Sequence, residues 1–224
     1  GPDHVAAMIC EPVMGAGGVI VPPKGYYEKI QAVCRKYDML FVADEVICGF
    51  GRTGNVWGSQ TLNIKPDILT CAKALSASFL PISAVMVNDK VYQALMSESD
   101  KIGTWGHGFT YSGHPVAAAV ALEAQKIYDE MDLFGHAKRM TPAFTKHIQS
   151  FADHPLVGEA MSVGMMGALE IVADKKTKAP FDLVAVGAGN RVYNHAVARG
   201  LFIRNMGDRL AICPPVVINE VQLA

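Results

Sequence analysis

Two short apolar runs, each followed by charged residues, constrain the fold of this chain more than any other feature. Met39–Ala43 leads directly into the acidic pair Asp44-Glu45, and Asp67–Ala72 leads into Lys73. Apolar runs of this length are typical of strands that are buried on both faces of a parallel sheet. Because ligands of open α/β sheets bind beyond the carboxyl ends of the strands, the charged residues mark a candidate site.

Strands and helices alternate along the rest of the chain. The first part predicts strands at 5–10, 39–43, 68–72 and 82–87, and helices at 26–37, 89–97, 115–128 and 133–151. The second part predicts strands at 164–172, 201–204 and 209–213, with a helix at 184–199. This order indicates a doubly wound α/β sheet in residues 1–131, followed by a smaller α+β domain in residues 132–224.

The first strand and the first helix carry more detailed expectations. Val5–Cys10 is expected to be a core strand that is buried on both faces. Because this strand begins so near the start of the chain, we expect the chain to be part of a longer protein. In the helix at 26–37, apolar residues at helical spacing predict the buried face: Tyr26, Ile30, Val33, Cys34 and Tyr37.

The composition argues against several kinds of partner and site. Half of the 224 residues are hydrophobic and the net charge is −1, so no basic surplus suggests a nucleic-acid partner. No apolar run approaches the roughly 18 residues of a membrane span. The five cysteines are odd in number and form no CxxC pair, which favours reduced thiols in a cytoplasmic protein over disulfides or a zinc site. The histidines show no metal-ligand spacing, so no metal site is expected.

The acidic pair allows three interpretations. Both carboxylates could simply be solvated at a strand end, or they could hold magnesium in a nucleotide hydrolase. A hydrolase needs a phosphate loop of the G-x-x-x-x-G-K-[ST] kind, which the sequence lacks. The third interpretation is a partner for the ring nitrogen of pyridoxal phosphate (PLP). In an extended segment Asp44 and Val46 point the same way and Glu45 the opposite way, so Val46 could pack on the ring that Asp44 pairs with.

Lys73 and Thr110 could supply the other groups that PLP chemistry needs. A lysine directly after a buried strand is most often a surface residue whose amine reaches solvent. The alternative is a lysine that forms a Schiff base with PLP. The small neighbours Ala72, Ala74 and Ser76 leave room for a flat cofactor, and a desolvated amine loses its proton more easily. Thr110 adds a hydroxyl that could donate to the cofactor's phosphate.

The glycine-rich segment Gly15–Gly18 could be taken for a dinucleotide-binding loop. It is followed by Val-Ile-Val-Pro-Pro rather than by the start of a helix that would offer amides to a pyrophosphate. We therefore expect a tight structural loop at this position.

Four motifs, in this order, resemble the class III (ω-) aminotransferases, which are fold-type I PLP enzymes. The motifs are Glu11-Pro12…Gly15–Gly18, Asp44–Gly54, Pro66–Leu75 and Gly108–Pro115. The resemblance covers the whole chain. It implies the PLP-dependent transferase fold type I, with part of the parallel-rich, PLP-binding large domain in residues 1–131 and an incomplete small domain in residues 132–224.

The resemblance also assigns roles to individual residues. It implies PLP as the cofactor, Lys73 as the Schiff-base lysine, Asp44 as the partner of the pyridine nitrogen and Val46 against the ring. It implies Thr110 as a phosphate ligand donated across the interface of a homodimer with shared active sites. Segments 46–49, 78–81 and 204–215 most resemble the amine:pyruvate branch, in which the residue matching Arg204 pairs with a substrate carboxylate. An exposed strand-end arginine is the alternative for Arg204.

The implied activity is transfer of an amino group from a primary amine or ω-amino acid to a keto acid such as pyruvate. Ala77-Ser78 stand where many relatives carry glycine, which leaves the branch open. Another class III PLP enzyme, such as an ornithine- or GABA-type aminotransferase, an aminomutase or a decarboxylase, is therefore an alternative. The glycine–serine turn that binds the phosphate and the aromatic residue that stacks on the ring are absent from the chain. The alternative to an active enzyme is a truncated, inactive fragment that binds no cofactor.

Overall fold

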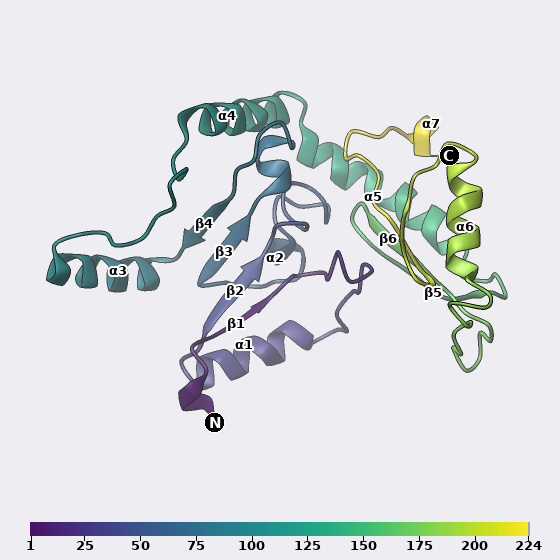
Figure 1. Cartoon of the computed structure of the whole chain (residues 1–224), viewed down its shortest axis with the longest axis horizontal. Coiled ribbons are helices and arrows are strands. Elements are labelled where there is room, and N and C mark those ends of the chain that lie inside the picture. The colour runs from purple at the N-terminus through teal and green to yellow at the C-terminus, as the bar shows by residue number, and fades with distance from the viewer. Residues whose placement is uncertain (224) are drawn as a thin grey trace. The chain divides into compact units, whose positions relative to one another are not determined.

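The computed structural model describes residues 1–223, and the chain divides into two compact units (Figure 1). Unit 1 comprises residues 1–12, 23–50 and 57–132. Unit 2 comprises residues 13–22, 51–56 and the chain from Leu133 on. Each unit contains a four-stranded sheet.

The sheet of unit 1 is mostly parallel. Its strands, in spatial order, are β1 (Ala7–Cys10), β2 (Leu40–Asp44), β3 (Ile68–Cys71) and β4 (Ala84–Val87). The first three strands run parallel, and β4 is antiparallel to β3. The helices are η1 (Pro2–His4), α1 (Tyr26–Lys36), α2 (Gly58–Thr61), η2 (Lys73–Ser76), α3 (Asp89–Ile102) and α4 (Pro115–Glu130). The predicted α/β class is thus observed, with an antiparallel strand at one edge.

One local expectation for unit 1 is wrong, and a second is only partly confirmed. β1 is an edge strand rather than a strand buried on both faces, and the side chain of Ile9 is 63% exposed. In α1 Cys34 is buried as expected, but Tyr26, Val33 and, directly after the helix, Tyr37 are exposed, and Tyr27 and Gln31 are buried instead. The hydroxyl of Tyr27 donates to the carbonyl oxygen of Glu11 at 2.6 Å, which turns this tyrosine inward and rotates the buried face by about one position.

The sheet of unit 2 is antiparallel throughout. Its strands, in spatial order, are β5 (Val157–Val163), β6 (Met166–Ile171), β8 (Arg209–Ile212) and β7 (Arg204–Met206). The sequence did not predict β5, and it placed the strand before β8 at 201–204 instead of 204–206. The helices of this unit are α5 (Leu133–Gln149), α6 (Ala188–Val197) and α7 (Glu220–Leu223).

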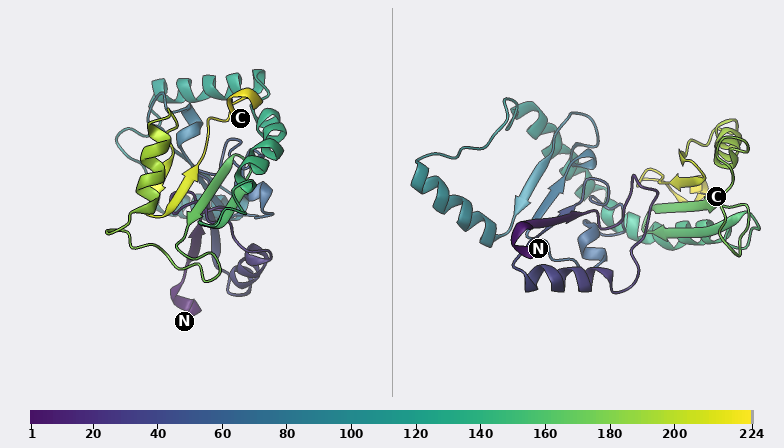
Figure 2. Two further views of the ribbon diagram at one scale, coloured as in Figure 1. Left: turned by 90° about the vertical axis from the view of Figure 1, so that its right-hand side faces the viewer. Right: turned by 60° about the horizontal axis from the view of Figure 1, so that its bottom comes forward.

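The core of unit 2 forms where α5 lies against the sheet (Figure 2). Ala137, Met140, Phe144 and Ile148 recur every three or four residues and so form one apolar stripe on this helix. All four are at most 5% exposed. They pack with buried residues of the sheet and its turns: Val157, Met165, Leu169, Ile171 and Leu210.

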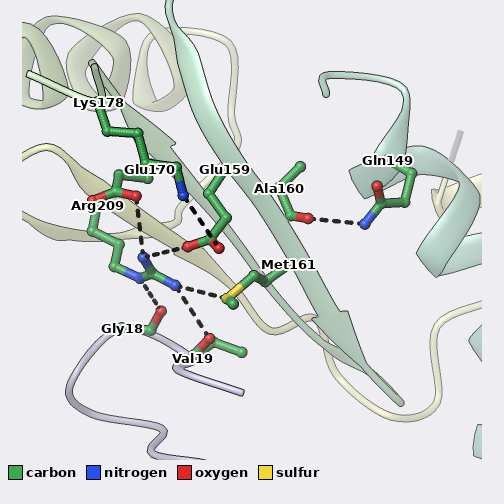
Figure 3. A network of polar contacts seen from close by, with 9 residues as sticks. All are labelled: Gly18, Val19, Gln149, Glu159, Ala160, Met161, Glu170, Lys178 and Arg209. Atoms are coloured by element: carbon green, nitrogen blue, oxygen red, sulfur yellow. Dashed lines mark hydrogen bonds and ion pairs between the residues drawn. The ribbon is translucent and has the colours of Figure 1, made fainter. Parts of the chain in front are cut away.

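Two arginine side chains hold the short segments 13–22 and 51–56 against the rest of unit 2. Arg209 on β8 donates from Nε to the carbonyl oxygen of Gly18 at 2.5 Å and from Nη2 to that of Val19 at 3.4 Å (Figure 3). The same guanidinium lies 3.6 Å from Glu159 and 3.8 Å from Glu170. The glycine-rich segment is therefore a structural loop, as expected, closed by a bridge between residues 14 and 20. Arg52 donates to the carbonyl oxygen of Pro214 at 2.5 Å and holds segment 51–56 in the same way.

Within the described residues, no helix is long and apolar enough to cross a lipid bilayer. No disulfide joins any of the cysteines there.

Candidate active site at the carboxyl ends of β2 and β3

Asp44 is the last residue of β2, and its carboxylate has one oxygen engaged and one available. Oδ1 accepts from the backbone amide of Val46 at 3.0 Å and lies 3.4 Å from the hydroxyl of Thr70 on β3. Oδ2 accepts no hydrogen bond from the residues that the structure describes. The carboxylate is half-buried, so its orientation is fixed while one oxygen can still accept a proton donor from a ligand.

Val46 was expected to continue the extended strand after Asp44, but it lies in a turn. β2 ends at Asp44 and residues 46–50 form turns, so the alternation of an extended strand does not extend to Val46. The short bond from the Val46 amide to Asp44 Oδ1 closes a turn, a typical use of an aspartate side chain. Val46 is half-buried beside Asp44, and its contact with a cofactor ring stays a prediction.

Glu45 is a residue whose importance the sequence did not indicate. Its side chain is 0% exposed, and it accepts from the amide of Gly58 at 2.8 Å through Oε2 and from the amide of Ser59 at 2.6 Å through Oε1. Burial raises the pKa of the Glu45 carboxyl above its ordinary value, hydrogen bonds from Ser59 and Gly58 oppose this rise, and the charge of Asp44 adds to it. Both oxygens are occupied by backbone amides, which argues against a magnesium site shared with Asp44.

Lys73 lies two residues after the end of β3 at Cys71, and it opens the short 3-10 helix η2. Its backbone is left-handed, with φ of 47°, a conformation that costs a non-glycine residue about 1 kcal/mol or more. The side chain is exposed, and its amine has no hydrogen bond or ion pair within the described part of the chain. Lys178 also has a left-handed backbone, with φ of 55°, so the strain alone does not identify a functional lysine, and the role of Lys73 stays a prediction.

Helix α4 holds the backbone around Lys73 in place. The side chain of Gln125 donates to the carbonyl oxygen of Leu75 at 2.9 Å, and the hydroxyl of Tyr128 donates to that of Ala74 at 2.7 Å. The carbonyl oxygen of Ala74 also accepts from the amide of Ala77 at 3.3 Å, so the bonds from α4 add to those within the short helix and help to hold the strained turn.

The sheet brings Asp44 and Lys73 to the same edge. β2 and β3 are neighbouring parallel strands, with Asp44 opposite Thr70 in the register, so their carboxyl ends lie side by side. The structure therefore places a free carboxylate oxygen and a free amine at adjacent strand ends, as the two apolar runs predicted. A flat cofactor with a basic ring nitrogen and a carbonyl group would fit these two groups.

Thr110 lies on the long connection between α3 and α4. Its side chain is exposed, and its hydroxyl has no partner among the described residues. Its neighbours Phe109 and Tyr111 are 78% and 82% exposed, and they line an open hollow of about 650 Å³ together with residues 81–83, 112–114, 117 and 118. The structure does not place Thr110 in contact with Asp44 or Lys73, and a role for Thr110 toward a phosphate stays a prediction.

Arg204 begins β7 of unit 2, where it pairs with Ala211 of β8. Its side chain is exposed, and its guanidinium has no hydrogen bond or ion pair with any described residue. Arg209 and Arg52 of the same unit are both engaged with carbonyl oxygens, so Arg204 is available to an external anion in a way that they are not.

Comparison with known proteins gives consistent matches over the whole chain. A family model described as aminotransferase class-III matches residues 1–224. The chain is 48% identical over 220 residues to the probable gamma-aminobutyrate transaminase 2, mitochondrial, of Oryza sativa subsp. indica, covering 98% of this chain and 44% of that protein. It is 46% identical over 222 residues to gamma aminobutyrate transaminase 3, chloroplastic, of Solanum lycopersicum, covering 98% of this chain and 42% of that protein.

Solved structures match equally well. A transaminase with L-alanine superposes with a TM-score of 0.96 at 53% identity, covering 100% of this chain and 52% of that one. The omega transaminase from Pseudomonas jessenii in complex with PMP superposes with a TM-score of 0.94 at 51% identity, covering 100% of this chain and 49% of that one. The chain thus spans about half the length of the relatives it matches, and the predicted fold class is confirmed.

Proposed function

The chain belongs to the class-III aminotransferase family, and on that premise we propose that the full-length protein is a PLP-dependent transaminase. It would move an amino group from a primary amine or ω-amino acid to a keto acid such as pyruvate. The observation that carries this proposal is that Asp44 and Lys73 lie at the carboxyl ends of neighbouring parallel strands. Their available atoms, an unpartnered carboxylate oxygen and an unpartnered amine, fit the ring nitrogen and the carbonyl group of PLP.

The chemistry that PLP supplies when bound is a carbonyl group that reacts with amines and a protonated ring that draws electrons from the substrate. In this proposal Asp44 Oδ2 holds the proton on the ring nitrogen, because a carboxylate beside a pyridinium favours the charged ring. Lys73 would hold the cofactor, and its free amine would carry a proton to and from the substrate carbon. Val46 would pack against the ring.

Two further residues complete the proposed site. Thr110 would donate its hydroxyl to the cofactor's phosphate in a second copy of the chain, which makes a homodimer with shared sites part of the proposal. The exposure of Thr110 and its two aromatic neighbours supports this role. Arg204 would pair with the carboxylate of a keto acid, for which the planar guanidinium offers two parallel hydrogen bonds.

The assignment of residues 1–131 to the cofactor-binding domain and of residues 132–224 to the small domain is part of the same proposal. We further propose a reducing compartment, the cytoplasm, on the basis of five cysteines without a disulfide among the described residues. Relatives include proteins named mitochondrial and chloroplastic, so fractionation of the source cells is the direct test.

A γ-aminobutyrate donor is the second candidate within this activity, because relatives at 46–48% identity are named for it. Turnover of γ-aminobutyrate and of an uncharged arylalkylamine, each with pyruvate as acceptor, separates the two. A preference of more than about tenfold for either donor identifies the physiological class, since that factor corresponds to about 1.4 kcal/mol in the transition state.

Borohydride reduction followed by peptide mapping tests the proposed function. We expect one pyridoxyl group on Lys73 of the full-length protein. Lys73→Ala should abolish turnover while PLP still binds without a covalent link. Lys90→Ala is the matched control, because Lys90 is an exposed lysine in a surface ion pair with Asp38 and should carry no label. A label on another lysine, or near-normal turnover by Lys73→Ala, would refute the assignment.

A further inference from the structure

Glu45 is fixed by several hydrogen bonds, although the proposed function gives this residue no role. Its carboxylate is fully buried, faces no cation among the described residues, and accepts one backbone amide on each oxygen. Its own amide donates to the carbonyl oxygen of Thr70 at 2.9 Å, and its carbonyl oxygen accepts from the amide of Gly49 at 2.9 Å. Four hydrogen bonds therefore fix this one residue in position and direction.

The turn that contains Glu45 packs closely against residues 57–58. A Cβ atom added at Gly58 would lie 2.7 Å from Cys48 Cβ and 3.1 Å from Glu45 Oε2. A Cβ added at Gly49 would lie 2.8 Å from the carbonyl oxygen of Glu45 and 2.9 Å from the ring of Trp57. The turn after β2 thus sits directly against residues 57–58, at a distance that only glycine permits.

Burial of a carboxylate is costly, and hydrogen bonds offset that cost only in part. An apolar side chain of similar size would avoid the cost of the buried charge but would leave the amides of Gly58 and Ser59 without their acceptors. The two residues that flank Glu45 are Asp44 and Val46, which the proposed function assigns to the cofactor ring. A fixed Glu45 therefore fixes the backbone from which both of these side chains project.

We propose that Glu45 is a positioning residue for the cofactor. By binding the amides of Gly58 and Ser59 it locks the turn that aims Asp44 Oδ2 at the ring nitrogen and sets Val46 against the ring. This inference rests on the proposed function, because it needs Asp44 at the pyridine nitrogen. It assigns to Glu45 a role in cofactor geometry that differs from a general contribution to folding.

The test is Glu45→Gln in the full-length protein. Glutamine keeps the size of the side chain but offers one acceptor oxygen, so its NH₂ group faces a backbone amide that is also a donor. We expect the dissociation constant for PLP to rise about tenfold. In the cofactor-free protein, we expect the amides of residues 44–50 to exchange hydrogen about tenfold faster. If this variant does not fold, Glu45→Asp, which keeps the charge but cannot reach both amides, is measured in its place.

Gln31→Met is the matched control. Gln31 is 8% exposed and makes three hydrogen bonds in unit 1, to Tyr27, Asn63 and Lys65, none of them to the turn after β2. At a similar loss of thermal stability, Gln31→Met should change the PLP dissociation constant by less than about twofold. If Glu45→Gln weakens PLP binding no more than Gln31→Met does, Glu45 only supports the fold and the inference is wrong.

Asp44→Asn in the same series separates this inference from the proposed function. If Asp44→Asn weakens PLP binding and shifts the pH midpoint of the cofactor's visible absorbance while Glu45→Gln does neither, only the role of Glu45 fails. If Asp44→Asn changes neither quantity, Asp44 is not at the ring, and the proposed site and this inference fail together.

Discussion

Replacement of Arg209 by methionine should loosen the glycine-rich loop from unit 2. The side chain of Arg209 is 16% exposed, and its strongest contact is the 2.5 Å bond to the carbonyl oxygen of Gly18. A hydrogen bond from a charged group is worth about 1.5–3 kcal/mol, and the carbonyl that loses it is left without a partner. The ion pairs to Glu159 and Glu170 add at most about 1 kcal/mol, since both carboxylates are about a third exposed and the distances exceed 3.5 Å. Methionine keeps much of the packing, so we expect the free energy of unfolding to fall by about 2–4 kcal/mol.

Urea denaturation of the full-length protein measures this loss, and hydrogen exchange of residues 13–22 locates it. Lys178→Met is the control, because Lys178 contributes only an exposed ion pair to Glu159 at 3.7 Å and should cost less than about 1 kcal/mol. Equal losses for the two variants, or unchanged exchange in residues 13–22 of Arg209→Met, would show that the guanidinium does not hold the loop.

Three further outcomes are expected for the proposed site. Asp44→Asn should keep the turn, because Oδ1 remains an acceptor for the amide of Val46. It should lower turnover on the order of a hundredfold, because the charge at the ring is lost. Turnover within about twofold of the parent would contradict this expectation. Mixing Lys73→Ala with Thr110→Ala protomers should restore activity in one of the two sites of the hybrid dimer, and failure despite proven subunit exchange would contradict the shared site. Arg204→Ala should raise KM for pyruvate by roughly 10- to 100-fold, because a charge-assisted pair worth about 1.5–3 kcal/mol is lost. The half-reaction with an uncharged arylalkylamine should be nearly unchanged. An equal loss for both substrates would assign Arg204 a structural role.

Much of unit 1, and the placement of Asp44 and Lys73 at one edge of its sheet, could be predicted from the sequence. Mostly apolar runs located β2 and β3, although Thr70 interrupts the second, and charged residues after them located Asp44 and Lys73. The rule that parallel strands place their carboxyl ends together then brought the two residues to one edge. The left-handed backbone of Lys73 could not be predicted, because non-glycine residues seldom adopt it without support from the surrounding fold.

The parts that were missed depend on contacts between residues distant in the sequence. β5 contains Gly158, Glu159 and Ser162, which break the apolar pattern, and it forms because it pairs with β6. The hydrogen bonds of the Glu45 side chain could not be predicted, because a sequence pattern does not show which amides a carboxylate will meet. Those amides belong to residues 13 and 14 positions further along the chain.

The division of unit 2 into three separate stretches of chain has a consequence for the order of events during synthesis. The bond from Arg209 to Gly18 joins residues 191 positions apart. Ribosomes add about 5–20 residues per second, so residues 13–22 leave the ribosome roughly 10–40 s before the strand that receives them. The described part of unit 1 ends at Asp132 and can associate within that interval, whereas the early segments of unit 2 must wait without their partners. The newly made chain therefore passes through a period in which these segments are accessible to chaperones and proteases.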